Sequence, residues 1–113
     1  MSDQGWIGVD LDGTLAYYDK WRGISHIGAP IPMMLRRVKQ WLYDGKEVRI
    51  FTARVSAGDQ NALEAIQQWL KEVGLPPLVI TCMKDFNMTE LWDDRAVQVE
   101  MNTGRRMDGQ YEI

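Results

Sequence analysis

The sequence predicts an α/β fold, a three-layer sandwich built around a small parallel β-sheet with a short C-terminal hairpin. Two observations support this prediction. Short apolar runs alternate along the chain with amphipathic segments of helical period. Their strand–helix–strand–helix–strand order favours a parallel sheet covered by helices. The 113 residues contain no internal repeat and no linker, so residues 1–113 are expected to form a single domain.

The first half of the chain holds two predicted strands and one predicted helix. An apolar run over residues 6–10 indicates a buried strand, and a loop rich in glycine, proline and aromatic residues follows it. A helix is predicted over residues 32–44, with Pro32 in its first turn and Gly45 beyond its end. Its apolar residues recur at helical spacing: Met34, Val38, Trp41 and Leu42. Residues 47–51 form the second predicted strand.

The second half opens with a helix signal at Asp59, because aspartate favours the N-cap position. The apolar stripe of this helix consists of Ala62, Ile66, Trp69, Leu70 and Val73. Gly74 and the Pro76-Pro77 pair end the helix. Two further strands are predicted over residues 78–81 and 90–92.

The C-terminal region shows a strand-like alternation over residues 96–100, followed by a turn signal at 102–104. An Asn-Thr-Gly turn can return the chain as a β-hairpin. We therefore expect a short hairpin at this end of the domain.

Polar residues follow each predicted strand of the sheet. Because ligands of open parallel sheets bind beyond the carboxyl ends of the strands, these residues are expected to converge at one edge. They are Asp10 and Asp12 after the first strand, Thr52 after the second, Lys84 after the third, and Asp93 and Asp94 after the fourth. The convergence follows from the order of elements alone.

The segment Asp10–Leu15 reads D-L-D-G-T-L and carries the most specific chemical signal. It places two carboxylates two residues apart at the end of an apolar strand. One acid can then lie beside a metal while the second reaches the same reacting group. This arrangement suits attack of a carboxylate on phosphorus with the help of a proton donor. Thr14 is expected to fix the turn that presents both acids.

Four segments in this order resemble the motifs of the haloacid dehalogenase-like superfamily of phosphohydrolases: Asp10–Leu15, Phe51–Arg54, Lys84 and Leu91–Arg95. The resemblance spans most of the chain and implies a Rossmann-like sheet. Neither gap between the motifs has room for an inserted cap domain, so the chain resembles a minimal, capless catalytic domain. Its site is expected to be open unless another subunit or the loop over residues 16–31 covers it.

The resemblance implies a role for each matching acid. Asp10 would be the nucleophile and form an aspartyl-phosphate, while Asp12 would protonate the leaving oxygen and later activate water. Mg²⁺ would be held by Asp10, the backbone carbonyl of Asp12, and Asp93 or Asp94. Which of the last two aspartates binds the metal stays open at this point.

The remaining site residues would bind the phosphoryl group or the rest of the substrate. Thr52 would donate through its hydroxyl and N–H, and the backbone N–H groups around Leu11 to Gly13 could do the same. Lys84 would neutralise charge on both the phosphate and Asp10. Three residues are candidate substrate contacts: Arg54, Tyr17 and Trp21.

An acid two residues after the nucleophile resembles phosphatases and phosphotransferases rather than dehalogenases. The sequence thus predicts a Mg²⁺-dependent phosphomonoester phosphatase acting through an aspartyl-phosphate, on a nucleotide or another small phosphorylated metabolite. Three alternatives stay open. They are a phosphatase for 3′ or 5′ phosphate ends of nucleic acid, a phosphate- or metal-binding module without turnover, and a phosphotransferase.

Composition narrows the partners and the compartment. The net charge of −3 argues against broad electrostatic binding of nucleic acid, so a nucleic-acid end is possible but not favoured. No apolar run is long enough to cross a bilayer, and Cys82 is the single cysteine. A cytoplasmic protein with a small phosphorylated substrate, no membrane partner and a possible homo-oligomer is therefore expected.

Overall fold

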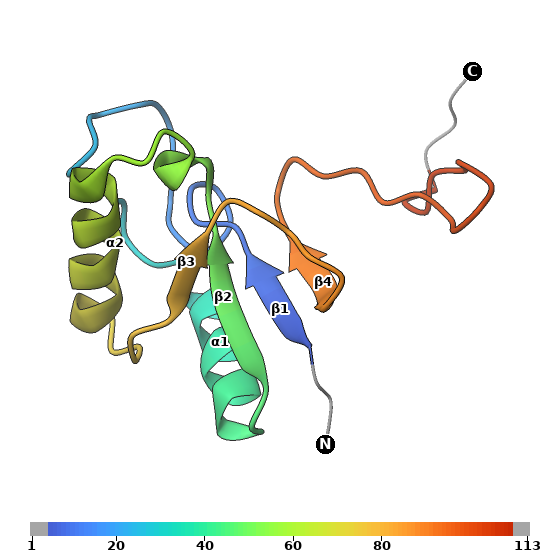
Figure 1. The fold of residues 1–113 in the computed structure, drawn as a ribbon, viewed down its shortest axis with the longest axis horizontal. Coiled ribbons are helices and arrows are strands. Elements are labelled where there is room, and N and C mark those ends of the chain that lie inside the picture. The colour runs from blue at the N-terminus through green and yellow to red at the C-terminus, as the bar shows by residue number, and fades with distance from the viewer. Residues whose placement is uncertain (1–4, 110–113) are drawn as a thin grey trace.

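The computed structural model describes residues 5–109 and shows an α/β architecture with two helices and four strands (Figure 1). The elements in chain order are β1 (Trp6–Val9), α1 (Pro32–Tyr43), β2 (Glu47–Phe51), a short 3₁₀ turn η1 (Ala53–Val55), α2 (Gln60–Glu72), β3 (Val79–Thr81) and β4 (Met88–Trp92). Their order and type agree with the predicted α/β class. No helix within the described range is long and apolar enough to cross a membrane.

The four strands form one parallel sheet in the order β3-β2-β1-β4. Ile7 pairs with Val48 and Val9 with Ile50, so these four side chains share one face of the sheet. Because all strands run the same way, their carboxyl ends meet at one edge (Figure 1). Asp10, Thr52 and Asp93 directly follow β1, β2 and β4 and therefore lie at that edge.

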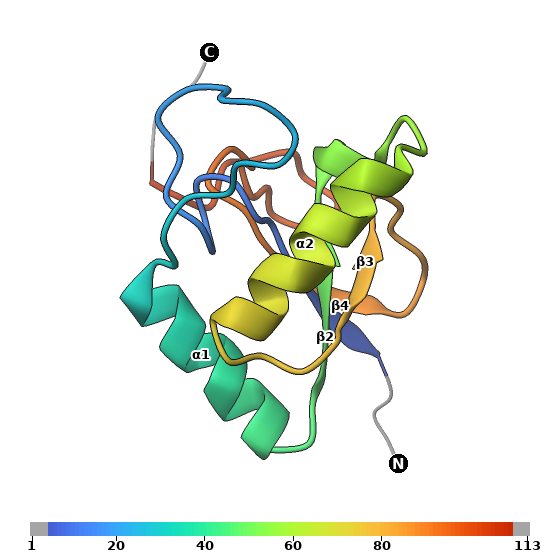
Figure 2. The same ribbon diagram turned by 90° about the vertical axis from the view of Figure 1, so that its left-hand side faces the viewer.

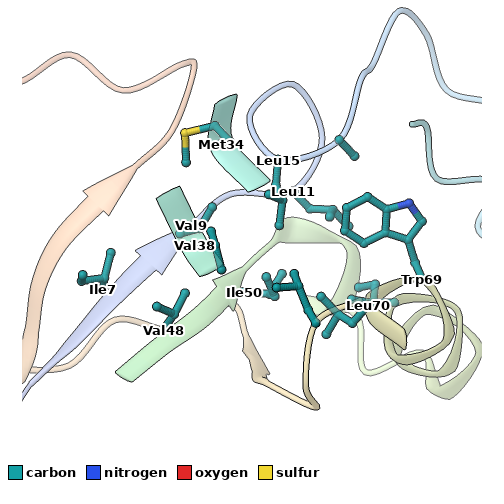
Figure 3. Packing of buried hydrophobic residues seen from close by; sticks show 13 residues of the cluster. Ile7, Val9, Leu11, Leu15, Met34, Val38, Val48, Ile50, Trp69 and Leu70 are labelled. Carbon is teal, nitrogen blue, oxygen red and sulfur yellow. The ribbon is translucent and has the colours of Figure 1, made fainter. Parts of the chain in front are cut away.

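Both helices pack on the same face of the sheet. Side chains of β1 and β2 meet Met34 and Val38 of α1 and Trp69 and Leu70 of α2 in one apolar cluster (Figure 3). Figure 2 shows α1 and α2 together on one side of the strands. This arrangement is consistent with a Rossmann-like fold, whereas the predicted three-layer sandwich is not confirmed, because no second helical layer is present between residues 5 and 109.

The opposite face of the sheet carries the large buried side chain of Trp6, although no described helix covers this face. Trp6 is 1 % exposed, and the Arg49 guanidinium lies 4.5 Å from the centre of its ring. The Trp6 Nε1–H donates to Asp85 Oδ1 at 2.9 Å, and that carboxylate belongs to the loop before β4. A cation over the ring and a paired indole N–H let this large side chain be buried without a covering helix.

Core packing predicts a large loss of stability for Ile50→Ala. Ile50 is fully buried in the cluster between the sheet and the helices. Removal of its side chain leaves a cavity that the surrounding strands and helices can fill only in part, so we expect a loss of about 2–5 kcal/mol in the free energy of unfolding. Urea unfolding followed by tryptophan fluorescence measures it, with the exposed Val79→Ala as control.

The element boundaries follow local signals. Asp59 caps α2 by accepting a hydrogen bond from the Asn61 N–H at 2.8 Å, which confirms the predicted N-cap. Helix α1 begins at Pro32 and ends at Tyr43, one residue before the predicted end. Strand β4 begins at Met88, two residues earlier than predicted.

The prediction of a C-terminal strand over residues 96–100 is wrong. Between residues 96 and 109 the structure has one antiparallel bridge, Val99 to Arg106, around a turn in which Asn102 has φ 69°. The segment extends away from the sheet (Figure 1), and Val97 and Val99 stay about half exposed. Alternating apolar residues form a strand only where a partner covers one face, and here none does among the described residues.

Candidate active site

The turn after β1 brings Asp10 and Thr14 close together. Backbone bonds close this turn: the N–H groups of Thr14, Leu15 and Ala16 donate to the Leu11 carbonyl, and the Gly13 N–H donates to the Ala16 carbonyl. Gly13 has φ 90°, and a Cβ added to it would lie 2.6 Å from Asp94 Oδ2. Only glycine therefore lets the turn lie against the acid that follows β4.

Three carboxylates from two strand ends form an acidic cluster, which we define as Asp10, Asp93 and Asp94. One oxygen of each lies within 4.8 Å of the others. The buried Thr14 hydroxyl connects the cluster, since it lies 3.3 Å from Asp10 Oδ2 and 3.1 Å from Asp94 Oδ1 and accepts a bond from the Asp94 N–H at 2.9 Å. Asp93 is fixed through Oδ1, which accepts from the Arg95 backbone N–H. Thr14 thus holds the turn in place, as expected, and also joins the two strand ends.

Burial and the charges of neighbouring carboxylates raise the pKa of Asp10. Burial, then the charge of Asp93, and then hydrogen bonding and charge from Asp94 raise the pKa of Asp10 to about 7, against a lowering by the Thr14 hydroxyl. A cation among these oxygens would relieve this repulsion. The donor set consists of carboxylate oxygens, the hard ligands that Mg²⁺ prefers, and no described residue bonds to the backbone carbonyl of Asp12. The residues present therefore fit a magnesium ion.

The raised pKa predicts how pH acts on the metal-free protein. The folded chain holds the Asp10 proton more tightly than the unfolded chain, whose carboxyl has the ordinary value of 3.8. Between pH 3.8 and about 7 the unfolded state therefore binds fewer protons, and the contribution of Asp10 to stability falls as pH rises. It is fully present below that window and lost above it.

In chelator, we expect the melting temperature of wild type relative to that of Asp10→Asn to fall from about pH 4 to about pH 7 and then to level off. Thermal unfolding of both proteins across this range measures the difference. A difference in melting temperature that stays constant with pH would contradict the raised pKa of Asp10. Added Mg²⁺ should raise the wild-type melting temperature most at the upper end of the range, because the ion competes with the proton.

Asp12 lies outside the acidic cluster and is held by Arg54. The Arg54 Nε–H donates to Asp12 Oδ2 at 2.7 Å, and an Nη2–H donates to Oδ1 at 2.9 Å. The Arg54 side chain is 5 % exposed and that of Asp12 is 21 % exposed. Arg54 was expected to contact substrate, and its pairing with Asp12 across the sheet edge could not be anticipated from the sequence. A buried arginine needs a carboxylate partner, but burial at this position leaves no mark in the sequence.

The predicted phosphate-binding groups are brought together only in part. Thr52 is buried, its hydroxyl accepts from the Arg54 N–H at 3.1 Å, and its own N–H donates to the Thr81 carbonyl at 2.8 Å. The Thr52 hydroxyl proton is thus available to a ligand, whereas the N–H is not. The Gly13 N–H is likewise taken by Ala16, and the Leu11 N–H keeps no acceptor among the described residues. Lys84 is exposed in the loop after β3, and its side chain makes no hydrogen bond or ion pair within residues 5–109.

A small pocket of about 90 Å³ lies beside Asp12 under the loop that follows β1. Its lining includes Tyr17 and Arg54, which are two of the candidate substrate contacts, and His26. Trp21 does not line the pocket, but its ring lies 4.9 Å from the Arg54 guanidinium. The loop therefore contacts the site through the same arginine that holds Asp12.

Comparison with known proteins supports the fold but does not identify a family or an activity. No protein-family model and no curated protein matches the chain. The structure is similar to that of a conserved protein from Bacteroides thetaiotaomicron, with a TM-score of 0.61 and 19 % identity over 84 % of this chain and 79 % of that one. At this level of identity the likeness shows a shared α/β fold.

Proposed function

We propose that this protein is a Mg²⁺-dependent phosphomonoester phosphatase that acts through an aspartyl-phosphate, as a minimal, capless member of the haloacid dehalogenase-like superfamily. The observation that carries the proposal is the position of Asp10. Asp10 directly follows β1, an inner strand of the sheet, and its carboxylate belongs to the acidic cluster. A second acid, Asp12, lies two residues later and is paired with the buried Arg54. Two carboxylates kept in different surroundings suit two different roles.

The resemblance implies a role for each of the two acids. An Asp10 oxygen attacks phosphorus, the bond from phosphorus to the leaving oxygen breaks, and that oxygen takes a proton from Asp12. Water then attacks the aspartyl-phosphate, Asp12 takes a proton from the water, and the bond from phosphorus to Asp10 breaks. Phosphate leaves, and Asp10 is a carboxylate again. The Thr52 hydroxyl lies at the same edge and can donate to the phosphoryl oxygens.

The acidic cluster is where magnesium would be held, by Asp10, Asp93 and Asp94 with the Asp12 carbonyl. When bound, the ion reduces repulsion between the nucleophile and an anionic phosphate and stabilises charge on the phosphoryl oxygens. The raised pKa of Asp10, to about 7, supports this role, because three neighbouring carboxylates are unfavourable until a cation joins them.

The test is release of phosphate from p-nitrophenyl phosphate, small sugar and alcohol phosphates, nucleotides, and oligonucleotides phosphorylated at either end. We expect release with Mg²⁺, none in chelator, and full retention of activity in Asp59→Asn, which changes an acid at an N-cap where Asn serves equally well. Preference for oligonucleotide ends would favour the nucleic-acid alternative. Release accelerated by added alcohols would indicate a phosphotransferase.

The same panel separates enzyme from binding module. Calorimetry with Mg²⁺ and with inorganic phosphate measures ligand binding without turnover. Binding of both ligands with no phosphate release from any substrate would contradict the proposed phosphatase and leave a phosphate-binding module.

A further inference from the structure

The pocket beside Asp12 has no role in the steps at phosphorus. Asp12 lines it, whereas none of the acidic-cluster residues does. A phosphoryl group at Asp10 would therefore leave the rest of a substrate to extend toward Asp12 and this pocket. The other walls come from the loop after β1, including Tyr17, Tyr18 and His26.

Arg54 holds both the acid and the wall of this pocket. Besides its two bonds to Asp12, the guanidinium donates to the Ile24 carbonyl at 3.1 Å and to the His26 carbonyl at 2.9 Å. A planar, always-charged guanidinium with five donors can satisfy all four acceptors at once, which an ammonium cannot do with the same geometry. One side chain thus fixes the direction of the Asp12 carboxylate relative to the loop.

The size and lining of the pocket limit what it can accept. Its volume is about 90 Å³, which leaves room for a small group. Pockets that enclose drug-sized ligands are larger, at about 300–1,000 Å³. The lining mixes tyrosine rings with charged groups, and Asp19 is paired with Arg22 within it. A small polar group fits such a space, whereas a whole nucleoside would not be enclosed by it.

We propose that this pocket is the leaving-group subsite, that it takes small hydroxylated alcohols, and that Arg54 is the positioning residue that aims Asp12 at the leaving oxygen. The proposal rests on the proposed phosphatase function. It selects alkyl phosphates among the possible substrates, because an alkoxide is a poor leaving group and needs the proton that Asp12 supplies. A p-nitrophenolate leaves without a proton.

The test compares glycerol phosphate with p-nitrophenyl phosphate in wild type, Arg54→Lys and the control Arg49→Lys, whose arginine lies over Trp6. Arg54→Lys is expected to lower kcat/KM for glycerol phosphate by about 10²-fold or more, and for p-nitrophenyl phosphate by less than about fivefold. Arg49→Lys should lower neither. Equal losses on the two substrates would reduce Arg54 to a purely structural role and overturn the inference.

Failure of the inference and failure of the proposed function can be told apart. If wild type cleaves p-nitrophenyl phosphate but not glycerol phosphate, the leaving-group assignment is wrong and the phosphatase stands. If wild type cleaves neither with Mg²⁺, both are wrong.

A second variant tests the pocket without touching Arg54. Tyr17 is 60 % exposed, and among residues 5–109 its one hydrogen bond runs from its backbone N–H to the Ala29 carbonyl. Tyr17→Ala should therefore fold normally and raise KM for glycerol phosphate severalfold, with inhibition by inorganic phosphate unchanged. An unchanged KM would show that the alcohol does not occupy this pocket and would overturn the inference.

Discussion

Asp10→Asn is expected to lower kcat for phosphate release by about 10⁴-fold or more, because the amide cannot form the aspartyl-phosphate. The substitution keeps the size of the side chain and leaves an acceptor for Thr14, whose hydroxyl lies 3.3 Å from Asp10 Oδ2. The fold should therefore persist while the covalent step is lost. Metal affinity should fall as well, since one of the three carboxylates of the acidic cluster is removed.

Three measurements check this expectation. Steady-state rates with saturating Mg²⁺ give the loss in kcat, and calorimetry gives the loss in metal affinity. Mass spectrometry of acid-quenched protein should find a phosphoryl group on Asp10 in wild type and none in the variant. A phosphoryl group on Asp12, or full turnover by Asp10→Asn, would contradict the assignment of the nucleophile.

Arg54→Met is expected to lower the free energy of unfolding by about 3–5 kcal/mol, the range for breaking a buried ion pair by removing one partner. The Arg54 side chain is 5 % exposed, and methionine fills much of its volume without a charge. The Asp12 carboxylate and the Ile24 and His26 carbonyls would then lose their donors together.

Urea unfolding measures the effect, with Arg22→Met as the matched control. Arg22 also forms an ion pair with an aspartate, because its guanidinium lies 2.6 Å from the Asp19 carboxylate, but both side chains are more than 40 % exposed. An exposed pair contributes little, so the control should leave the midpoint nearly unchanged. Equal effects of the two substitutions would show that burial of the Arg54 pair is not what stabilises the loop.

Most of the fold could be predicted because its signals are local. The helical period around Val38, the proline that opens α1 and the cap at Asp59 each act within one or two turns of chain. The order of strands and helices then left few ways to arrange a parallel sheet. The strand predicted over residues 96–100 was wrong, because the alternation of apolar residues is also a local signal. It does not show whether another part of the chain covers one face of the strand.

The carboxylates of the candidate site could be predicted from the sequence, but the ion pair between Asp12 and Arg54 could not. Asp10, Asp93 and Asp94 meet because they follow neighbouring strands. The pairing of Asp12 with Arg54 depends on how two side chains turn at the sheet edge, and these residues are 42 positions apart. Lys84 was predicted to neutralise Asp10, but its side chain is exposed and bonds to none of the described residues.

The bond between Thr14 and Asp94 joins residues 80 positions apart, which has a consequence for the order of events in biosynthesis. β1 is synthesised before its neighbours in the sheet, so it must wait for β2 and then for β4, the last of the four described strands in chain order. Contacts of such large sequence separation form slowly. Until they form, a nascent chain carries Asp10 without Asp93 and Asp94, so the acidic cluster, and with it the proposed metal site, is assembled only when synthesis of the sheet is complete.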